Sequence, residues 1–148
     1  MSHQIPTPRV VRQLPPCRIL VAEDHEMNRQ LVRAILERFG ATIIEAKNGR
    51  EAVERVAEER SAGRALDLVL MDLTMPELDG FGATRELRAA GFAAPIVAIT
   101  GNGTESDRRE CLASGFDDFA AKPVRKDKLL EIVATRLGSK APEEGNPR

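Results

Sequence analysis

Short apolar runs alternate along this chain with longer segments whose apolar residues recur at helical spacing. Two of the runs, 68–71 and 96–99, are apolar at every position, which is typical of strands covered on both faces of a parallel sheet. Such alternation predicts an α/β fold in which helices cover both faces of the sheet. The expected strands are 18–22, 42–46, 68–71, 96–99 and 119–121.

The segments between the runs predict helices, several of which end at a glycine. Gly40 follows the first, because a residue without a Cβ adopts the left-handed conformation that closes a helix. The expected helices are 25–39, a short one after 46, and about 81–90, 105–114 and 126–137. The apolar stripe of the first comprises Leu31, Val32, Ile35, Leu36 and Phe39. The second is expected to bury Ala52, Val53, Val56 and Ala57.

The length of 148 residues fits one domain. The proline-rich segment 1–16 predicts a flexible lead-in, 17–138 the folded domain, and 139–148 a disordered tail. The formal net charge of -1 and the lack of Trp and Tyr argue against a nucleic-acid partner. No apolar run approaches the roughly 18 residues of a membrane span, and the N-terminus lacks an apolar signal core. We therefore expect no membrane association and a cytoplasmic location.

Chemically active side chains follow the expected strands. Glu23 and Asp24 follow the first strand, Asp72 the third, Thr100 the fourth and Lys122 the fifth. Because ligands of open α/β sheets bind beyond the carboxyl ends of the strands, we expect these side chains to converge. Clustered carboxylates repel one another, and a lysine with a divalent cation would offset this. Mg2+ prefers such oxygen ligands, so the pattern predicts a magnesium and phosphate site.

Each of these residues also has a plainer interpretation when it is considered alone. An acidic pair before a helix commonly stabilises the helix N-terminus, and a single Asp after a strand is commonly a turn residue. Cys17 and Cys111 lack a metal-binding spacing and are expected to be small buried residues. The joint occurrence of acids, hydroxyl and lysine, each after the appropriate strand, favours the phosphate site.

Four segments of the chain resemble the receiver domains of two-component response regulators, particularly receivers attached to hybrid histidine kinases. The segments are 19–29, 70–80, 96–101 and 115–123. The resemblance covers about residues 17–138. It implies a flavodoxin-like (βα)5 three-layer sandwich with a parallel five-stranded sheet in the order 2-1-3-4-5.

The resemblance also implies a role for each matching residue of the site. Asp72 would accept the phosphoryl group, and Lys122 would pair with that group. Mg2+ would be held by Asp24, by Asp72 and by the backbone carbonyl of Thr74, with Glu23 as the second acid acting through water.

Thr100 and Phe119 match the switch hydroxyl and the switch aromatic of the family. Phe119 stands where Tyr is frequent, so the resemblance implies a switch that works by packing alone. Gly101 replaces the commoner Ala of the family. The peptide bond between Lys122 and Pro123 is expected to be cis.

The resemblance implies a histidine kinase or a histidine phosphotransfer protein as the partner. Met27 and Val124 flank the expected site and are apolar where a solvated loop would be polar, so we expect them to form a docking patch. The alternative is that each tucks onto the edge of its own domain. The chain is expected to be monomeric, with a phosphorylation-dependent dimer as the alternative.

Three other functions fit parts of the pattern less well. A haloacid-dehalogenase-type phosphatase needs a second Asp two residues after the first, where Thr74 stands. A nucleotide-binding module is suggested only by the two glycines of 101–103, which is a poor match to a dinucleotide motif. A pseudo-receiver used only for docking is disfavoured by the complete set of acids, Thr and Lys. A stand-alone regulator and a receiver belonging to a hybrid kinase both remain open.

Overall fold

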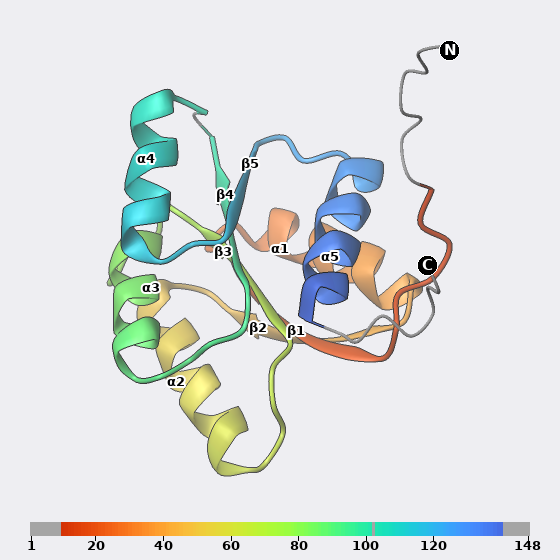
Figure 1. The fold of residues 1–148 in the computed structure, drawn as a ribbon, viewed down its shortest axis with the longest axis horizontal. Coiled ribbons are helices and arrows are strands. Elements are labelled where there is room, and N and C mark those ends of the chain that lie inside the picture. Colours follow the sequence, from red (N-terminus) through yellow and green to blue (C-terminus); the bar gives the residue numbers. More distant parts are fainter. Residues whose placement is uncertain (1–9, 102, 141–148) are drawn as a thin grey trace, which may run out of the picture.

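The computed structural model describes residues 10–101 and 103–140, and strand alternates with helix throughout (Figure 1). The strands are β1 (Cys17–Ala22), β2 (Ala41–Ala46), β3 (Leu68–Asp72), β4 (Ile96–Thr100) and β5 (Asp118–Ala121). The helices are α1 (Glu26–Arg38), α2 (Gly49–Ser61), α3 (Gly80–Ala89), α4 (Glu105–Ser114) and α5 (Lys126–Lys140).

All neighbouring strands of the sheet pair in parallel, in the order β2-β1-β3-β4-β5. This confirms the predicted α/β fold and its strand order. The direction in which strands are added reverses between β1 and β3, so the loops after these two strands diverge to opposite faces of the sheet. The crevice between them is where open α/β sheets bind ligands.

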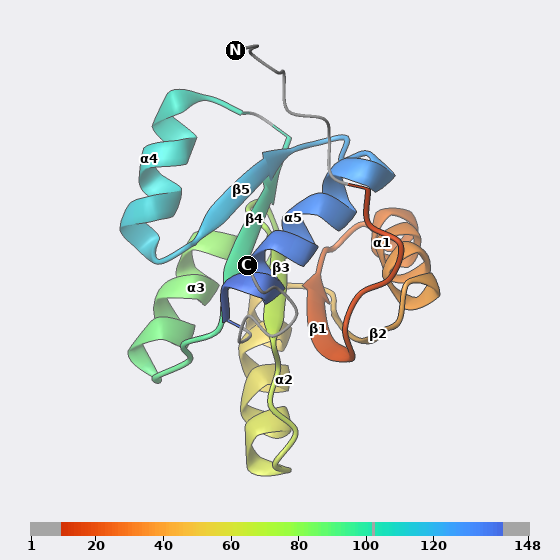
Figure 2. The ribbon, with the colours of Figure 1, turned by 45° about the vertical axis from the view of Figure 1, so that its right-hand side comes forward.

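The helices form two layers, one on each face of the sheet (Figure 2). Helices α1 and α5 share an apolar core with one face, while α2, α3 and α4 share a second core with the other. Alternate residues of a central strand serve the two cores: Leu20 and Ala22 face one, and Ile19 and Val21 face the other. Burial on both faces explains why these strands are apolar without alternation.

The helix ends follow the predicted glycines. Gly40 and Gly115 both have φ near +109°, a region that residues with a Cβ seldom occupy. Cys17 and Cys111 are free and buried, and burial with nearby acids raises the pKa of each thiol to about 11. Both therefore serve as small core residues, as predicted.

Two residues of the expected helical stripes do not face the core. Leu31 is 58% exposed, and Ala57 of α2 is exposed as well. At 100° per residue, Leu31 lies about 140° around α1 from the buried Leu36, which is outside the sector that reaches the sheet. The apolar stripe of α1 is therefore wider than its buried face.

The packed domain extends slightly beyond both predicted boundaries. Leu14 is buried, and its backbone N–H donates to the carbonyl oxygen of Phe39 at 2.9 Å, so the chain is packed before Cys17. Helix α5 continues to Lys140. The rest of the predicted lead-in (1–9) and tail (141–148) lies outside the described residues. In the described part of the chain, no helix is both long and apolar enough to span a lipid bilayer.

Candidate functional site

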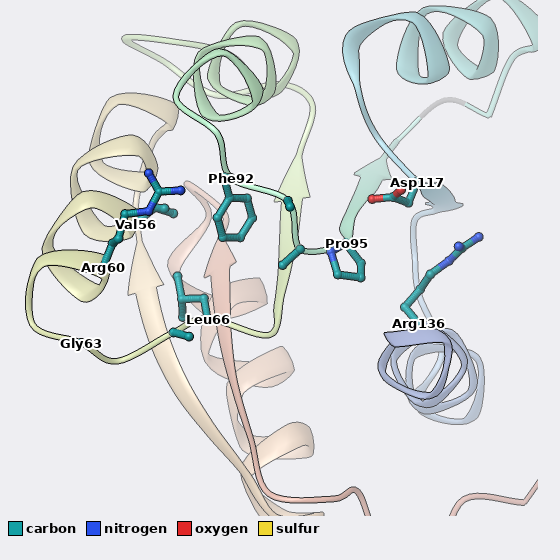
Figure 3. Close-up of a pocket in the computed structure, with 11 residues that line it drawn as sticks. Val56, Arg60, Gly63, Leu66, Phe92, Pro95, Asp117 and Arg136 are labelled. Carbon is teal, nitrogen blue, oxygen red and sulfur yellow. The ribbon is translucent and has the colours of Figure 1, made fainter. Parts of the chain in front are cut away.

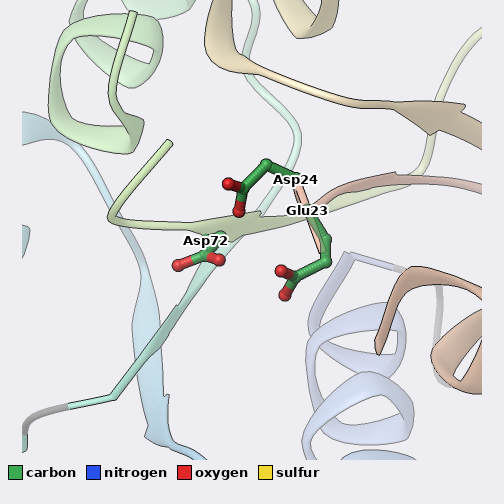
Figure 4. Close-up of side chains that lie close together, drawn as sticks. All are labelled: Glu23, Asp24 and Asp72. Atoms are coloured by element: carbon green, nitrogen blue, oxygen red, sulfur yellow. The ribbon is translucent and has the colours of Figure 1, made fainter. Parts of the chain in front are cut away.

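Three carboxylates converge beyond the carboxyl ends of β1 and β3 (Figure 4). Glu23 and Asp24 follow β1, and Asp72 is the last residue of β3. One carboxylate oxygen from each lies within 4.8 Å of the other two. Glu23 and Asp72 are buried, whereas Asp24 is exposed. The structure thus brings together the three acids identified in the sequence, and the cluster is exposed to solvent on the side of Asp24.

Lys122 approaches the two buried acids from the loop after β5. Its Nζ lies 2.9 Å from Oδ2 of Asp72 and 3.1 Å from Oε1 of Glu23. The backbone N–H of Lys122 donates to the carbonyl oxygen of Thr100 at 2.6 Å, and the bond to Pro123 is cis, as expected. One ammonium among three carboxylates leaves the site with an excess of negative charge.

Burial and the charges of the site shift the pKa values of Glu23 and Lys122. Burial and the nearby Asp72 charge raise the pKa of Glu23, against the hydrogen bond from the His25 amide and the attraction of Lys122. Burial acts to lower the pKa of Lys122, but its hydrogen bonds and attraction to Asp72 and Glu23 outweigh this and raise it. The lysine therefore stays charged, and it stabilises the acids only in part.

The loop after β3 folds back closely on Asp72. The backbone N–H of Thr74 donates to Oδ1 of Asp72 at 3.1 Å. The amide of Gly80 donates to the carbonyl oxygen of Leu73 at 3.0 Å, and a Cβ at Gly80 would lie only 2.3 Å from the carbonyl oxygen of Asp72. The glycine is therefore needed for this close approach, which orients the Asp72 carboxylate.

Arg29 is buried beside the acids, a feature that the sequence reasoning missed. It is 7% exposed, and its Nη1 donates to the carbonyl oxygen of Glu23 at 2.9 Å. Helical spacing would have revealed it, because Arg29 precedes the buried Leu36 by seven residues and so shares its face. A charged residue on the buried face of a helix needs a partner, and here that partner belongs to the acid loop.

Thr100 and Phe119 lie on neighbouring strands and on the same face of the sheet. Phe119 is paired in register with Ala98, and Thr100 is two residues beyond Ala98, so the three side chains share one face. Thr100 is buried and Phe119 is half-buried. The Arg108 guanidinium of α4 lies 5.6 Å from the centre of the Phe119 ring.

The two residues predicted for partner docking differ in exposure. Met27 is 76% exposed on the first turn of α1, whereas Val124 is half-buried and packs against the core beneath α1 and α5. Leu31, one turn after Met27, is the exposed apolar neighbour on the same helix. The sequence reasoning missed Leu31 because it assigned this residue to the core.

A cavity of about 600 Å³ lies at the opposite edge of the sheet. Figure 3 shows it between α2 and α5, with Phe92 and Leu66 in its wall. Residues that line it precede the strands, including Pro95 before β4 and Asp117 before β5. Glu23, Asp24 and Asp72 do not line this cavity, so it is separate from the acidic site.

Comparison with known proteins agrees with this geometry. Residues 19–134 match the family model described as "Response regulator receiver domain". The chain is 44% identical over 119 residues to the two-component response regulator ORR41 of Oryza sativa subsp. japonica, covering 79% of this chain and 91% of that protein. Three other curated relatives are much longer, and the chain spans 7% to 18% of their length.

Two solved structures resemble the chain as well. The receiver domain of the sensor histidine kinase PA1611 of Pseudomonas aeruginosa PAO1, described with a magnesium ion coordinated in its active-site cleft, is 36% identical, with a TM-score of 0.71. The alignment covers 84% of this chain and 99% of that one. A co-crystal structure of the Saccharomyces cerevisiae histidine phosphotransfer protein Ypd1 with the receiver domain of Ssk1 matches with a TM-score of 0.77 at 27% identity. That match covers 90% of this chain and 95% of that one.

The matched segment, the sheet order and the acidic site at the carboxyl edge agree with one another. The chain therefore belongs to the response regulator receiver domain family of two-component and phosphorelay signalling proteins.

Proposed function

We propose that Asp72 accepts a phosphoryl group from a phosphohistidine of a partner protein. The observation that carries this proposal is the position of the Lys122 ammonium, 2.9 Å from a buried carboxylate that ends a central strand among two other acids. The carboxylate is held by Lys122 and by the Thr74 amide, so it is oriented before any ligand arrives. In this proposal the domain is a signalling receiver that assists its own phosphorylation and dephosphorylation, and not a classical enzyme.

The proposed step transfers one phosphoryl group. A carboxylate oxygen of Asp72 forms a bond to phosphorus, and the bond between phosphorus and the histidine nitrogen breaks. The electron pair of the broken bond stays on the imidazole. Catalysis consists of positioning and of neutralising charge on the phosphoryl oxygens, for which Lys122 supplies one positive charge.

The donor set of the site fits Mg2+. The three clustered carboxylates, two of which pair with Lys122, offer only oxygen ligands, and a divalent cation would offset their excess charge. In the proposed site, Asp24, Asp72 and the backbone carbonyl of Thr74 hold Mg2+, with Glu23 acting through water. When bound, Mg2+ supplies positive charge that offsets the charge of the phosphoryl oxygens.

The proposed switch involves Thr100 and Phe119. Thr100 would turn its hydroxyl to a phosphoryl oxygen, and Phe119 would fill the space that the threonine leaves. Their place on one face of neighbouring strands supports this exchange. Phe119 has no hydroxyl, and its ring faces the Arg108 guanidinium, so an inward movement would change the contact between β5 and α4.

The proposed partner is a histidine kinase or a histidine phosphotransfer protein, as in the Ypd1–Ssk1 complex. Met27 is the centre of the proposed docking patch, and we include Leu31 in it because Leu31 is exposed and apolar one turn later on α1. Val124 contributes mainly by supporting α1 and α5 from below. The monomeric state, the absence of nucleic-acid binding and the cytoplasmic location stay predictions.

The test is phosphorylation by acetyl phosphate in the presence of Mg2+, followed by intact mass measurement. The wild-type chain should gain one phosphoryl group, and Asp72→Asn should gain none. Asp79→Asn is the matched control, because Asp79 lies in the same loop and only caps α3 through the Gly82 amide, which Asn can also do. Wild-type labelling of Asp72→Asn would refute the assignment of the phosphoacceptor.

A further inference from the structure

Arg29 joins the loop that carries two of the acids to the neighbouring edge strand. Its Nη1 donates to the carbonyl oxygen of Glu23 at 2.9 Å, and its Nε donates to Oε1 of Glu45 at 2.7 Å. Glu45 lies in β2, beside Val21 of β1 in the sheet register. One guanidinium therefore spans from the end of β1 to β2, and it is almost fully buried while doing so.

The bond from Arg29 completes the hydrogen bonding of the Glu23 backbone. The Glu23 amide donates to the carbonyl oxygen of Ala46 at 3.1 Å, and its carboxylate accepts from the His25 amide at 3.0 Å. Arg29 holds the remaining backbone group, the carbonyl oxygen, which belongs to the peptide that leads into Asp24. The direction of the Asp24 side chain therefore depends on a peptide plane that Arg29 holds.

The chemistry of the guanidinium suits this task. A guanidinium is planar and offers several donors at fixed angles, so it can bond a carbonyl and a carboxylate at once. The Arg29 hydrogen bond is also the main factor that lowers the pKa of Glu45, so Glu45 stays ionised as its counter-charge. An ammonium has no such fixed geometry and would hold one of the two partners less well.

We propose that Arg29 is a positioning residue that holds the Glu23–Asp24 loop in the conformation in which the three acids converge. The proposal rests on the metal and phosphate site described above, and it adds a residue that touches neither ligand. Outer residues of this kind typically change metal affinity by about tenfold or more when they are replaced.

Arg33 provides a matched control. It lies one turn further along α1 and also pairs with Glu45, but it reaches Glu37 rather than Glu23. Arg29→Lys and Arg33→Lys therefore make the same chemical change on the same helix, next to the same acid. Only Arg29→Lys removes the hydrogen bond from the guanidinium to the Glu23 carbonyl oxygen.

The experiment measures Mg2+ affinity by calorimetry without a phosphodonor, together with amide hydrogen exchange of His25 in metal-free buffer. Arg29→Lys should weaken Mg2+ binding about tenfold and speed the exchange of the His25 amide several-fold. Arg33→Lys should stay within about twofold of the wild type in both measurements. Labelling of Arg29→Lys by acetyl phosphate should return to near the wild-type rate at saturating Mg2+, because the phosphoacceptor itself is unchanged.

Unchanged Mg2+ affinity in a folded Arg29→Lys chain would overturn the proposal, and so would equal losses in the two lysine variants. If Arg29→Lys fails to fold, Glu45→Ala replaces it. This variant removes the counter-charge of Arg29 and leaves the three acids of the site unchanged. Normal affinity and normal His25 exchange in Glu45→Ala would then count against the proposal. A wild-type chain that neither binds Mg2+ nor accepts phosphate would refute the proposed function instead, while the His25 exchange still decides the role of Arg29.

Discussion

The ammonium nitrogen of Lys122 lies 2.9 Å from Asp72 and 3.1 Å from Glu23, so a single cation is shared by two buried carboxylates. Asp24, the third acid, lies on the exposed side of the cluster. The shared lysine draws the buried acids together but leaves the third charge without an equivalent partner among these four residues. This arrangement leads to distinct expectations for each acid.

Replacing Asp24 with Asn should weaken Mg2+ binding by at least about tenfold, because a carboxylate ligand is lost from a site that has few. In metal-free buffer the same variant should be slightly more stable, by about 0.5 kcal/mol, because repulsion among the acids falls. Calorimetry and thermal unfolding measure the two effects. Glu26→Gln, which changes an exposed acid two residues further on, should leave Mg2+ affinity unchanged and should not stabilise the metal-free chain, because it removes a favourable charge from the first turn of α1. Normal Mg2+ affinity of Asp24→Asn would remove this residue from the metal site.

Replacing Glu23 with Gln should raise the melting temperature at pH 7.5 in metal-free buffer. The pKa of Glu23 is raised above its usual 4.5, chiefly by burial, so its ionisation costs stability in the folded state. The wild type loses this stability as the pH rises through the raised pKa and recovers it as the pH falls toward 4.5. The advantage of Glu23→Gln should therefore shrink on acidification. A difference that stays constant from pH 7.5 to pH 4.5 would contradict this explanation.

Truncating Met27 and Leu31 together to Ala should slow phosphoryl transfer from a phosphohistidine protein about fivefold or more, as expected for the loss of apolar contacts central to an interface. Labelling by acetyl phosphate, which requires no docking, should be unchanged. Leu112→Ala is the matched control, because Leu112 is 59% exposed on α4 at the other face of the sheet. Equal slowing with both phosphodonors would show that Met27 and Leu31 support the phosphorylation site and do not contact the partner.

Replacing Thr84 with Val should stabilise the domain by about 1 kcal/mol. Thr84 is fully buried in α3, and within the described part of the chain its hydroxyl oxygen has no hydrogen-bond partner. An apolar group of the same shape removes the cost of burying that hydroxyl. Thr104→Val is the same substitution at the N-cap of α4, where the hydroxyl accepts from the Asp107 amide, and it should cost about 1 kcal/mol. Chemical denaturation compares the two, which should shift in opposite directions.

The sequence predicted the layers and the site because both depend on simple periodicity. Strands buried on both faces are apolar at every position, and parallel strands all end at one edge. Residues such as Asp72 and Lys122 could therefore be placed together from the sequence alone. The strand order could not be predicted from periodicity, and its prediction came from the resemblance to the receiver family.

What the sequence did not reveal depends on the width of the buried sector of each helix. Leu31 is apolar and near the stripe of α1, but it lies beyond the part of the helix that the sheet covers. Arg29 is charged, yet it lies within that part and is buried. Hydrophobic character alone could not separate the two cases, because burial depends on the position of a residue around the helix. Arg29 is tolerated in the buried sector because a carbonyl oxygen of the preceding loop accepts its hydrogen bond.

The shared lysine also has a consequence for the order in which the chain becomes competent. Asp72 and Lys122 are 50 residues apart, and they meet only when β3, β4 and β5 have all joined the sheet. A nascent chain that has been synthesised only as far as α4 contains the three site acids but lacks Lys122. The proposed phosphorylation of Asp72 therefore requires completed folding, and we expect truncated or partly folded chains not to accept a phosphoryl group.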